Sequence, residues 1–159
     1  MNTKLSALTF PEDYFCDEIR EGFYVSETMK RYWAAQLKVL SVINDICSRH
    51  GINWFADFGT LLGTIRHKGF IPWDDDLDIC MLREEFESFL FYARKELPAG
   101  YCVLYADDNE EYRYPFCRIT NSDEINKSKV FLLSSLFLWN VLMLALLQGI
   151  FLNSACKEC

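Results

Sequence analysis

Apolar residues recur at helical spacing in two segments of the chain. In the first segment the repeat forms one face of a helix, made of Trp33, Leu37, Leu40, Ile43 and Cys47. Ser26 can accept hydrogen bonds from the first turn, and Gly51 follows a basic end, so we expect this helix to lie between these two residues. A second amphipathic helix is expected over residues 83–97, because Pro98 and Gly100 follow it.

Shorter apolar or alternating runs between these segments indicate strands. We expect strands over residues 53–58, 76–81, 101–105 and 112–120. Apolar side chains alternate in the segment 76–81, which is typical of a half-buried strand. A helix of one to two turns is expected over residues 60–66, and residues 1–25 are expected to form an irregular N-terminal arm.

The last part of the chain differs from the rest in its hydropathy. Residues 130–152 contain no charged side chain, and about 20 apolar residues are enough to cross a bilayer as a helix. We therefore expect an apolar C-terminal helix here, either attached to a membrane or buried in the core. The expected organisation is an arm over 1–25, a core over 26–122 and a divergent apolar tail over 123–159.

The composition indicates one folded domain with a hydrophobic core. A chain of 159 residues with a net charge of −7 is long enough to fold and too acidic for broad nucleic-acid binding. Its seven cysteines have no regular spacing, and its start lacks the apolar run of a secretory signal. We expect a cytoplasmic protein without a nucleic-acid partner, placed at the inner face of the membrane if residues 130–152 attach it.

A group of acidic residues provides the candidate catalytic and metal site. Four aspartates occur within five positions, and a multivalent cation would relieve their mutual repulsion. Residues two apart in a strand face the same way, so Asp76 and Asp78 are expected to share one Mg²⁺ and to act in catalysis. Asp74 and Asp75 are expected in the loop as supporting or solvated charges. The alternative is an acidic surface turn that binds no metal.

A phosphate-binding group is expected just before these aspartates. Gly59 and Thr60 lie where a strand turns into a helix, and there a phosphate can reach backbone amides and the threonine hydroxyl. Arg66 can bind a phosphate with two hydrogen bonds, and Lys68 adds a point charge. The alternatives are an ordinary helix N-terminus and a solvated basic surface. Asp57, just before the turn, is a candidate general base or a carboxylate at the edge of the core.

Taken together, these motifs resemble the core of the LicD family, which consists of phosphotransferases with a nucleotidyltransferase-type fold and is related to the fukutin-like proteins. The resemblance rests on GTLLGTIRHKGFIPWDDDLDICMLRE at residues 59–84 and on WAAQL at residues 33–37. In nucleotidyltransferase-like folds a hydrophobic-Gly-Ser/Thr turn precedes an Asp-x-Asp strand. Residues 58–60 and 76–78 match this pattern, within a similarity that spans roughly residues 15–120.

The resemblance implies an α+β fold with a nucleotidyltransferase-like mixed sheet flanked by helices, and it implies Mg²⁺ as cofactor. It also implies transfer of a phospho-substituent, typically phosphocholine from CDP-choline, to a sugar hydroxyl of a surface glycan such as teichoic acid or lipopolysaccharide. The expected partners are therefore a CDP-activated donor and a glycan acceptor, with membrane association through residues 130–152.

The chain departs from the family pattern after Thr120. Family members continue to a motif like Gly-Ile-Asp-Ile-Phe-Pro-Leu-Asp, whereas the faint counterpart at residues 149–153 ends in Asn153. A second hypothesis is therefore that the chain has an aberrant end from about Asn121 and is an inactive or membrane-tethered protein that binds nucleotide or a partner without turnover. A third, a nucleotidyltransferase acting on a sugar or an antibiotic, is disfavoured by the IRHKGFIPWDDD run.

Overall fold

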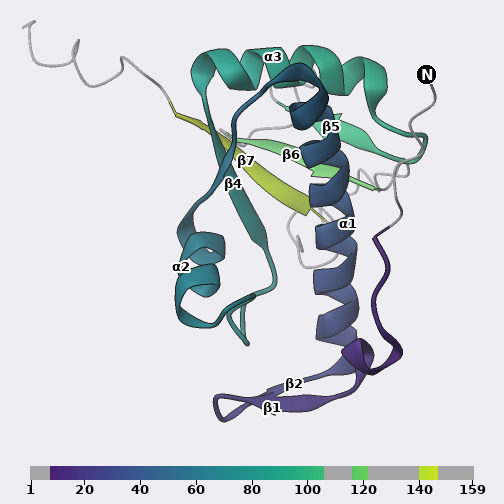
Figure 1. Ribbon diagram of the computed structural model, residues 1–159, viewed down its shortest axis with the longest axis vertical. Coiled ribbons are helices and arrows are strands. Elements are labelled where there is room, and N and C mark those ends of the chain that lie inside the picture. The colour runs from purple at the N-terminus through teal and green to yellow at the C-terminus, as the bar shows by residue number, and fades with distance from the viewer. Residues whose placement is uncertain (1–7, 106–115, 122–139, 147–159) are drawn as a thin grey trace, which may run out of the picture.

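The computed structural model describes residues 8–105, 116–121 and 140–146, and these form a mixed sheet with helices packed against it (Figure 1). The helices are α1 (Glu27–His50), α2 (Phe58–Arg66) and α3 (Arg83–Glu96). The strands, in spatial order, are β3 (Phe55–Ala56), β4 (Leu77–Leu82), β7 (Asn140–Leu146), β6 (Cys117–Thr120) and β5 (Cys102–Leu104). β7 is parallel to β4 and antiparallel to β6. The predicted α+β fold with a mixed sheet and flanking helices is confirmed.

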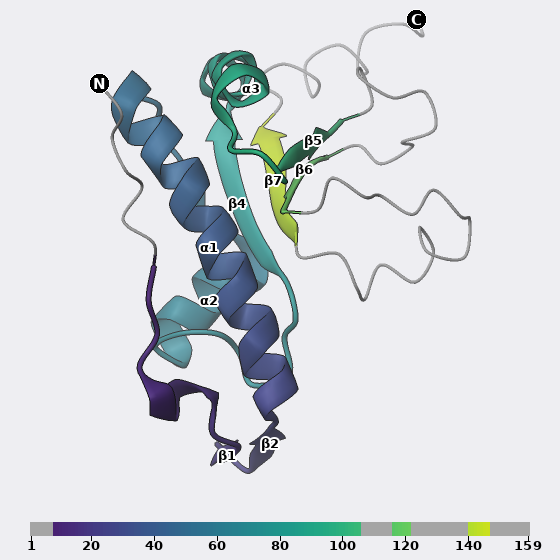
Figure 2. The same ribbon diagram turned by 90° about the vertical axis from the view of Figure 1, so that its right-hand side faces the viewer.

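The long helix α1 begins and ends where its local signals predict. The side chain of Ser26 accepts a hydrogen bond from the backbone N–H of Met29 at 3.2 Å, which satisfies one of the free donors of the first turn. Gly51 ends the helix with φ of 66°, a left-handed conformation that glycine adopts without steric cost. Figure 2 shows α1 running alongside β4, and Figure 1 shows α3 lying across the end of both.

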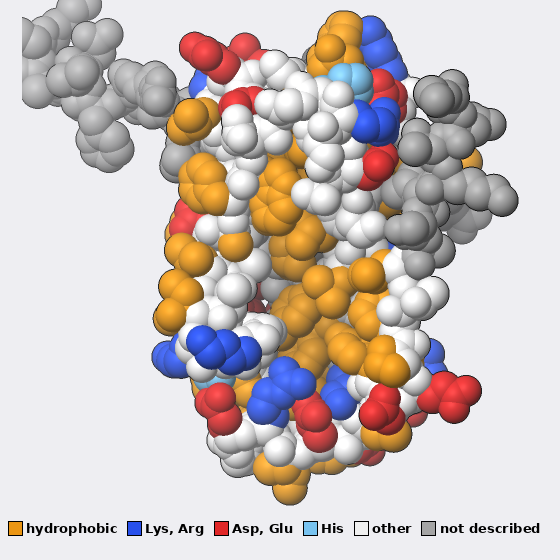
Figure 3. Space-filling model, in the orientation of Figure 1, with side chains coloured by type: hydrophobic (Ala, Val, Ile, Leu, Met, Phe, Trp, Pro, Cys, Tyr) orange, Lys and Arg blue, Asp and Glu red, His pale blue; other side chains and the backbone are white. Residues whose placement is uncertain are grey.

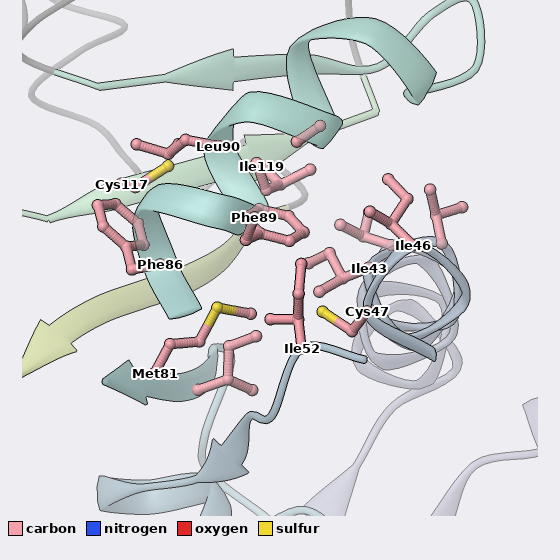
Figure 4. Packing of buried hydrophobic residues seen from close by; sticks show 14 of the residues in the cluster. Ile43, Ile46, Cys47, Ile52, Met81, Phe86, Phe89, Leu90, Cys117 and Ile119 are labelled. Carbon is pink, nitrogen blue, oxygen red and sulfur yellow. The ribbon is translucent and has the colours of Figure 1, made fainter. Parts of the chain in front are cut away.

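The core lies where α1 and α3 meet the sheet (Figure 4). Ile43 and Ile46 from α1 point toward Phe89 of α3, and Ile119 of β6 closes the cluster. The strand β4 is buried on both faces, since successive side chains point to opposite faces and residues 77–81 are all buried. The prediction of a half-buried strand is therefore wrong, because side chains of α1 and α3 pack on Leu77, Ile79 and Met81, and α2 also contacts the strand.

The N-terminal segment contains regular structure that the sequence did not predict. A 3₁₀-helix, η1 (Glu12–Phe15), precedes an antiparallel hairpin of β1 (Glu18–Arg20) and β2 (Phe23–Val25). The irregular arm expected over residues 1–25 is thus wrong for the hairpin, while residues 1–7 lie outside the described part. Asp17 attaches the hairpin to α1, because its carboxylate accepts hydrogen bonds from the Tyr24 hydroxyl and the Glu27 N–H.

The C-terminal segment corrects a second prediction. Residues 140–146, expected to be helical, form the strand β7 between β4 and β6, so the apolar C-terminal helix is wrong over these residues. An uninterrupted apolar run is equally typical of a strand inside a sheet, and periodicity alone does not distinguish the two. The rest of the segment 130–152 and the start of the strand expected over 112–120 lie outside the described residues. Among the helices that the structure describes, none is long and apolar enough to cross a membrane.

Candidate functional site

The candidate site is built on the turn that joins β3 to α2. Asp57 accepts a hydrogen bond from the Phe58 N–H at 2.9 Å, and Phe58 itself has φ of 44°, a left-handed conformation that is costly for a phenylalanine. The hydroxyl of Thr60 accepts the N–H of Asp78 at 2.7 Å, which joins α2 to β4. A hydroxyl has one donor besides its acceptor sites, so Thr60 can still donate to a ligand.

The space beside Gly59 is occupied by an acidic side chain. A Cβ added there would collide with the carboxylate of Asp74, which lies directly against the start of α2. The absence of a side chain therefore lets the acidic loop approach the helix backbone, at the position where the sequence predicted a phosphate.

The acidic loop is held in place by α1. The indole N–H of Trp33 donates to the backbone carbonyl of Asp74 at 2.8 Å, and the Gln36 amide donates to the carbonyl of Asp75. Both side chains are buried, Trp33 at 1% and Gln36 at 3% exposed. Helix α1 thus fixes the backbone that carries the aspartates, about 40 residues further along the chain.

The carboxylates of this loop and of β4 perturb one another. Burial, and next the charge of Asp76, raise the pKa of Asp78 from 3.8 to about 7. Burial and the neighbouring Asp76 also raise the pKa of Asp74, to about 6. Asp78 is 6% exposed, and its Oδ1 has no hydrogen-bond partner among the described residues. A cation would satisfy this oxygen and relieve the repulsion.

The residues present fit a Mg²⁺ ion whose coordination shell is completed by the substrate. Within the described residues, no three His, Cys, Asp or Glu side chains form a ready-made metal site. Mg²⁺ does not require one, since it is commonly bound by one or two carboxylates, waters and substrate phosphates. Asp76 and the unpartnered Oδ1 of Asp78 are the two carboxylates that the sequence proposed. Asp74 is a third candidate, because it lies against Asp76.

A pocket of about 400 Å³ opens beside these aspartates, between α1 and α2. Five residues singled out in the sequence line it: Gly59, Thr60, Lys68, Asp74 and Asp76. Its other lining includes residues that were not predicted for the site, among them Tyr14, Arg20, Trp33, Trp54 and Phe70. In Figure 3 hydrophobic side chains line the hollow and basic side chains gather along its lower edge. The pocket therefore combines acidic, basic and aromatic walls.

Three candidate residues from the sequence do not line the pocket: Asp57, Arg66 and Asp78, the last of which directly follows the lining residue Leu77. Arg66 is outside the pocket lining, and its Nε donates to His67, whose Nδ1 hydrogen-bonds Glu21 at 2.9 Å. Asp57 accepts a hydrogen bond from the thiol of Cys80 at 3.0 Å, and this bond lowers the pKa of the carboxyl. A carboxylate with a lowered pKa is a poor general base, so the candidacy of Asp57 is weakened.

Some of the unpredicted residues left a signal in the sequence. The segment containing Trp33 and Gln36 belongs to the resemblance described above, but its contact with the acidic loop is a tertiary feature. Arg20 left none, because the hairpin that carries it shows no clear periodic pattern.

The comparisons with known proteins point to one family. The family model for the LicD/FKTN/FKRP nucleotidyltransferase domain matches residues 51–138. The lipopolysaccharide cholinephosphotransferase LicD of Haemophilus influenzae is 38% identical over 81 residues, which cover 51% of this chain and 31% of that protein. An uncharacterized protein of Rickettsia prowazekii is 33% identical over 107 residues, covering 61% of this chain and 37% of its own length. The chain thus spans about a third of these relatives. No solved structure matches significantly.

Proposed function

This chain belongs to the LicD/FKTN/FKRP family of nucleotidyltransferase domains, and from this membership we propose a phosphotransferase activity of LicD type. The group transferred is a phospho-substituent resembling phosphocholine, carried by a CDP-activated donor. The acceptor is a sugar hydroxyl of a cell-surface glycan, such as lipopolysaccharide or teichoic acid. The name of the Haemophilus influenzae relative, a lipopolysaccharide cholinephosphotransferase, supports both the group and the acceptor class.

One observation carries the proposal: a buried, unpartnered carboxylate oxygen lies beside a pocket with further carboxylates and cations. Asp78 supplies the unpartnered oxygen, and Asp76 and Lys68 line the pocket. In the proposed reaction Asp76 and Asp78 hold Mg²⁺, which when bound neutralises charge on the phosphate oxygens. Thr60 donates its hydroxyl to the phosphate, and a phosphate that reaches the backbone at Gly59 displaces the Asp74 carboxylate that lies there.

The aromatic wall of the pocket suits the other end of the donor. Trp33 and Phe70 stack with their ring centroids 4.9 Å apart and their planes at 6°, and Trp54 and Tyr14 also line the pocket. Aromatic faces attract quaternary ammonium groups and stack on nucleobases. Either the head group or the base of a CDP-activated donor would therefore find a favourable surface here. We place the reaction in the cytoplasm, as expected from the sequence.

The experiment that tests the proposal measures donor binding and turnover separately. CDP-choline is titrated calorimetrically into the chain with Mg²⁺ and with EDTA, and release of CMP is then followed with lipopolysaccharide or teichoic acid as acceptor. Binding that requires Mg²⁺ and is lost in Asp76→Asn with Asp78→Asn, while circular dichroism stays unchanged, is the expected result. Unchanged binding in the double variant would reject the metal assignment. Binding without CMP release would support the hypothesis of a binding protein without turnover.

A further inference from the structure

We propose that Arg20, together with Lys68, forms the anion-binding end of the pocket and holds the phosphates of the donor. The sequence suggested Arg66 for this role. The inference rests on the proposed function and identifies which cations of this chain would bind its substrate.

Arg20 faces the same pocket as the acidic loop. It lines the pocket together with Lys68 and Asp76, although 48 or more residues separate it from them in sequence. Its guanidinium carbon lies 5.3 Å from the ring centroid of Trp33. The same indole donates its N–H to the carbonyl of Asp74. Trp33 therefore contacts Arg20 with its ring face and the acidic loop with its edge. This fixes the separation between the basic wall of the pocket, formed by Arg20, and the acidic wall, formed by the loop of Asp74.

The hairpin provides a fixed support for this arginine. Glu18 pairs with Arg20 at 2.5 Å and with Lys30 of α1 at 3.2 Å. Asp17 ties the hairpin to α1 through the Glu27 N–H at 2.6 Å. A guanidinium has five donors, so its pairing with one carboxylate leaves others that can bind a phosphate, and the side chain is 33% exposed. Arg20 is thus both positioned and accessible.

The position of Arg66 argues against the role predicted for it. Its Nε donates to His67 at 2.7 Å, and it is absent from the pocket lining. Lys68, two residues later, does line the pocket, and its ammonium group has three donors, one of which is used by the carbonyl of Ile65. A phosphorylated ligand in the pocket would therefore lie between the carboxylates, which would hold the metal, and the pair Arg20 and Lys68.

The test measures binding of two anions to the whole chain and three variants. Inorganic pyrophosphate and CDP are titrated with Mg²⁺ present into the unmodified chain, Arg20→Gln, Arg20→Lys and Arg66→Gln. We expect Arg20→Gln to weaken pyrophosphate binding about tenfold or more, the size expected for losing a charged hydrogen-bonding pair. Arg20→Lys keeps the charge but loses the fork, so an intermediate loss is expected. Arg66→Gln, the matched control, should change affinity less than about twofold.

Each outcome bears on a separate claim. Pyrophosphate binding that depends on Arg20, without any binding of CDP, would support the anion site and contradict the proposed donor. Loss of affinity in Arg66→Gln with none in either Arg20 variant would overturn the inference, as would absence of pyrophosphate binding to the unmodified chain. Thermal melting identifies a variant that has lost its fold. If Arg20→Gln unfolds, the affinity of Arg20→Lys for pyrophosphate tests the inference instead. Full affinity in that variant would refute a contact in which the guanidinium of Arg20 donates two hydrogen bonds to the phosphate.

Discussion

Replacing Asp78 by asparagine should make the stability of this protein less sensitive to pH when divalent cations are removed. The carboxyl group is 6% exposed, and its Oδ1 lacks a hydrogen-bond partner among the described residues. Burial, followed by the charges of Asp76 and Asp74, raises its pKa from 3.8 to about 7. The folded chain therefore holds a proton that the unfolded chain releases at much lower pH.

The direction of the effect follows from this difference in proton affinity. Because the pKa of Asp78 is higher in the folded state, its contribution to stability is fully present below pH 3.8 and is lost as the pH rises through about 7. Between pH 5 and 8.5 the loss in free energy of unfolding is on the order of 2 to 3 kcal/mol, with part of the charge still screened by water. Asp74, whose pKa is raised to about 6, contributes in the same direction, so the variant keeps part of the pH dependence.

Urea denaturation in EDTA at pH 5 and at pH 8.5 measures this loss directly. The unmodified chain should lose about 2 kcal/mol more between the two pH values than Asp78→Asn does. Asp75→Asn is the matched control, since Asp75 is exposed and lies in the same acidic segment. Equal losses in the unmodified chain and in Asp78→Asn would refute the reasoning, because they would mean that Asp78 ionises as easily in the folded state as in the unfolded one.

A second arm of the same experiment separates the metal from the proton. At pH 8.5, Mg²⁺ at about 100 times its dissociation constant should stabilise the unmodified chain by about 2.7 kcal/mol. Asp78→Asn should show little of this gain, because it lacks the carboxylate whose Oδ1 has no other partner. A gain of equal size in both proteins would place the ion elsewhere, whatever the pH series shows.

Three further substitutions test how the site is supported. Trp33→Phe keeps an aromatic ring but removes part of the buried indole and the N–H that binds the carbonyl of Asp74, so we expect a loss of at least about 1 kcal/mol in urea denaturation and weaker donor binding by calorimetry. Unchanged donor affinity would contradict the supporting role. Gly59→Ala places a methyl group against the Asp74 carboxylate and should weaken Mg²⁺-dependent donor binding by about tenfold. Unchanged donor affinity would show that the close approach of Asp74 to Gly59 does not matter for binding. Ser26→Ala removes the cap bond to Met29 and should cost about 1 kcal/mol of stability without altering donor affinity.

The helices could be predicted because their signals are local. Ser26 and Gly51 mark the two ends of α1, and the periodic apolar residues between them face the core. Pro98 and Gly100 mark the C-terminal end of α3 (Arg83–Glu96), which the sequence placed to within one residue. These features depend on residues within one or two turns, so no knowledge of the tertiary structure is needed to find them.

The strands were harder to predict because their environment is not local. The apolar run containing residues 140–146 fits a helix as well as a strand, and only its place between β4 and β6 decides. Likewise, the alternation in residues 76–81 suggested one buried face, but α2 also contacts β4, and Asp78 is buried as well. This burial is also what raises the pKa of Asp78, so the most unusual property of the site was not visible in its motif.

The candidate site likewise has one part that the sequence could predict and one part that it could not. The sequence identified the Gly59–Thr60 turn and the aspartates because they form one nearly continuous segment, and the bond from the Asp78 N–H to Thr60 brings the two ends of that segment together. Arg20 has no such link in sequence to Lys68, and its presence in the pocket depends on how the hairpin packs on α1. A choice among basic residues by proximity in sequence therefore favoured Arg66, which instead binds a neighbouring histidine.

Trp33 connects these two parts of the site. Its ring lies beside the guanidinium of Arg20, its N–H holds the carbonyl of Asp74, and it is 1% exposed. A buried aromatic ring that packs on a second ring, as Trp33 does on Phe70, has little freedom to move without disturbing its neighbours. The separation between the basic and acidic walls is therefore a property of the folded core rather than of two independent loops. A ligand that bridges both walls would meet a preformed distance, and this favours an elongated phosphorylated donor over a single small anion.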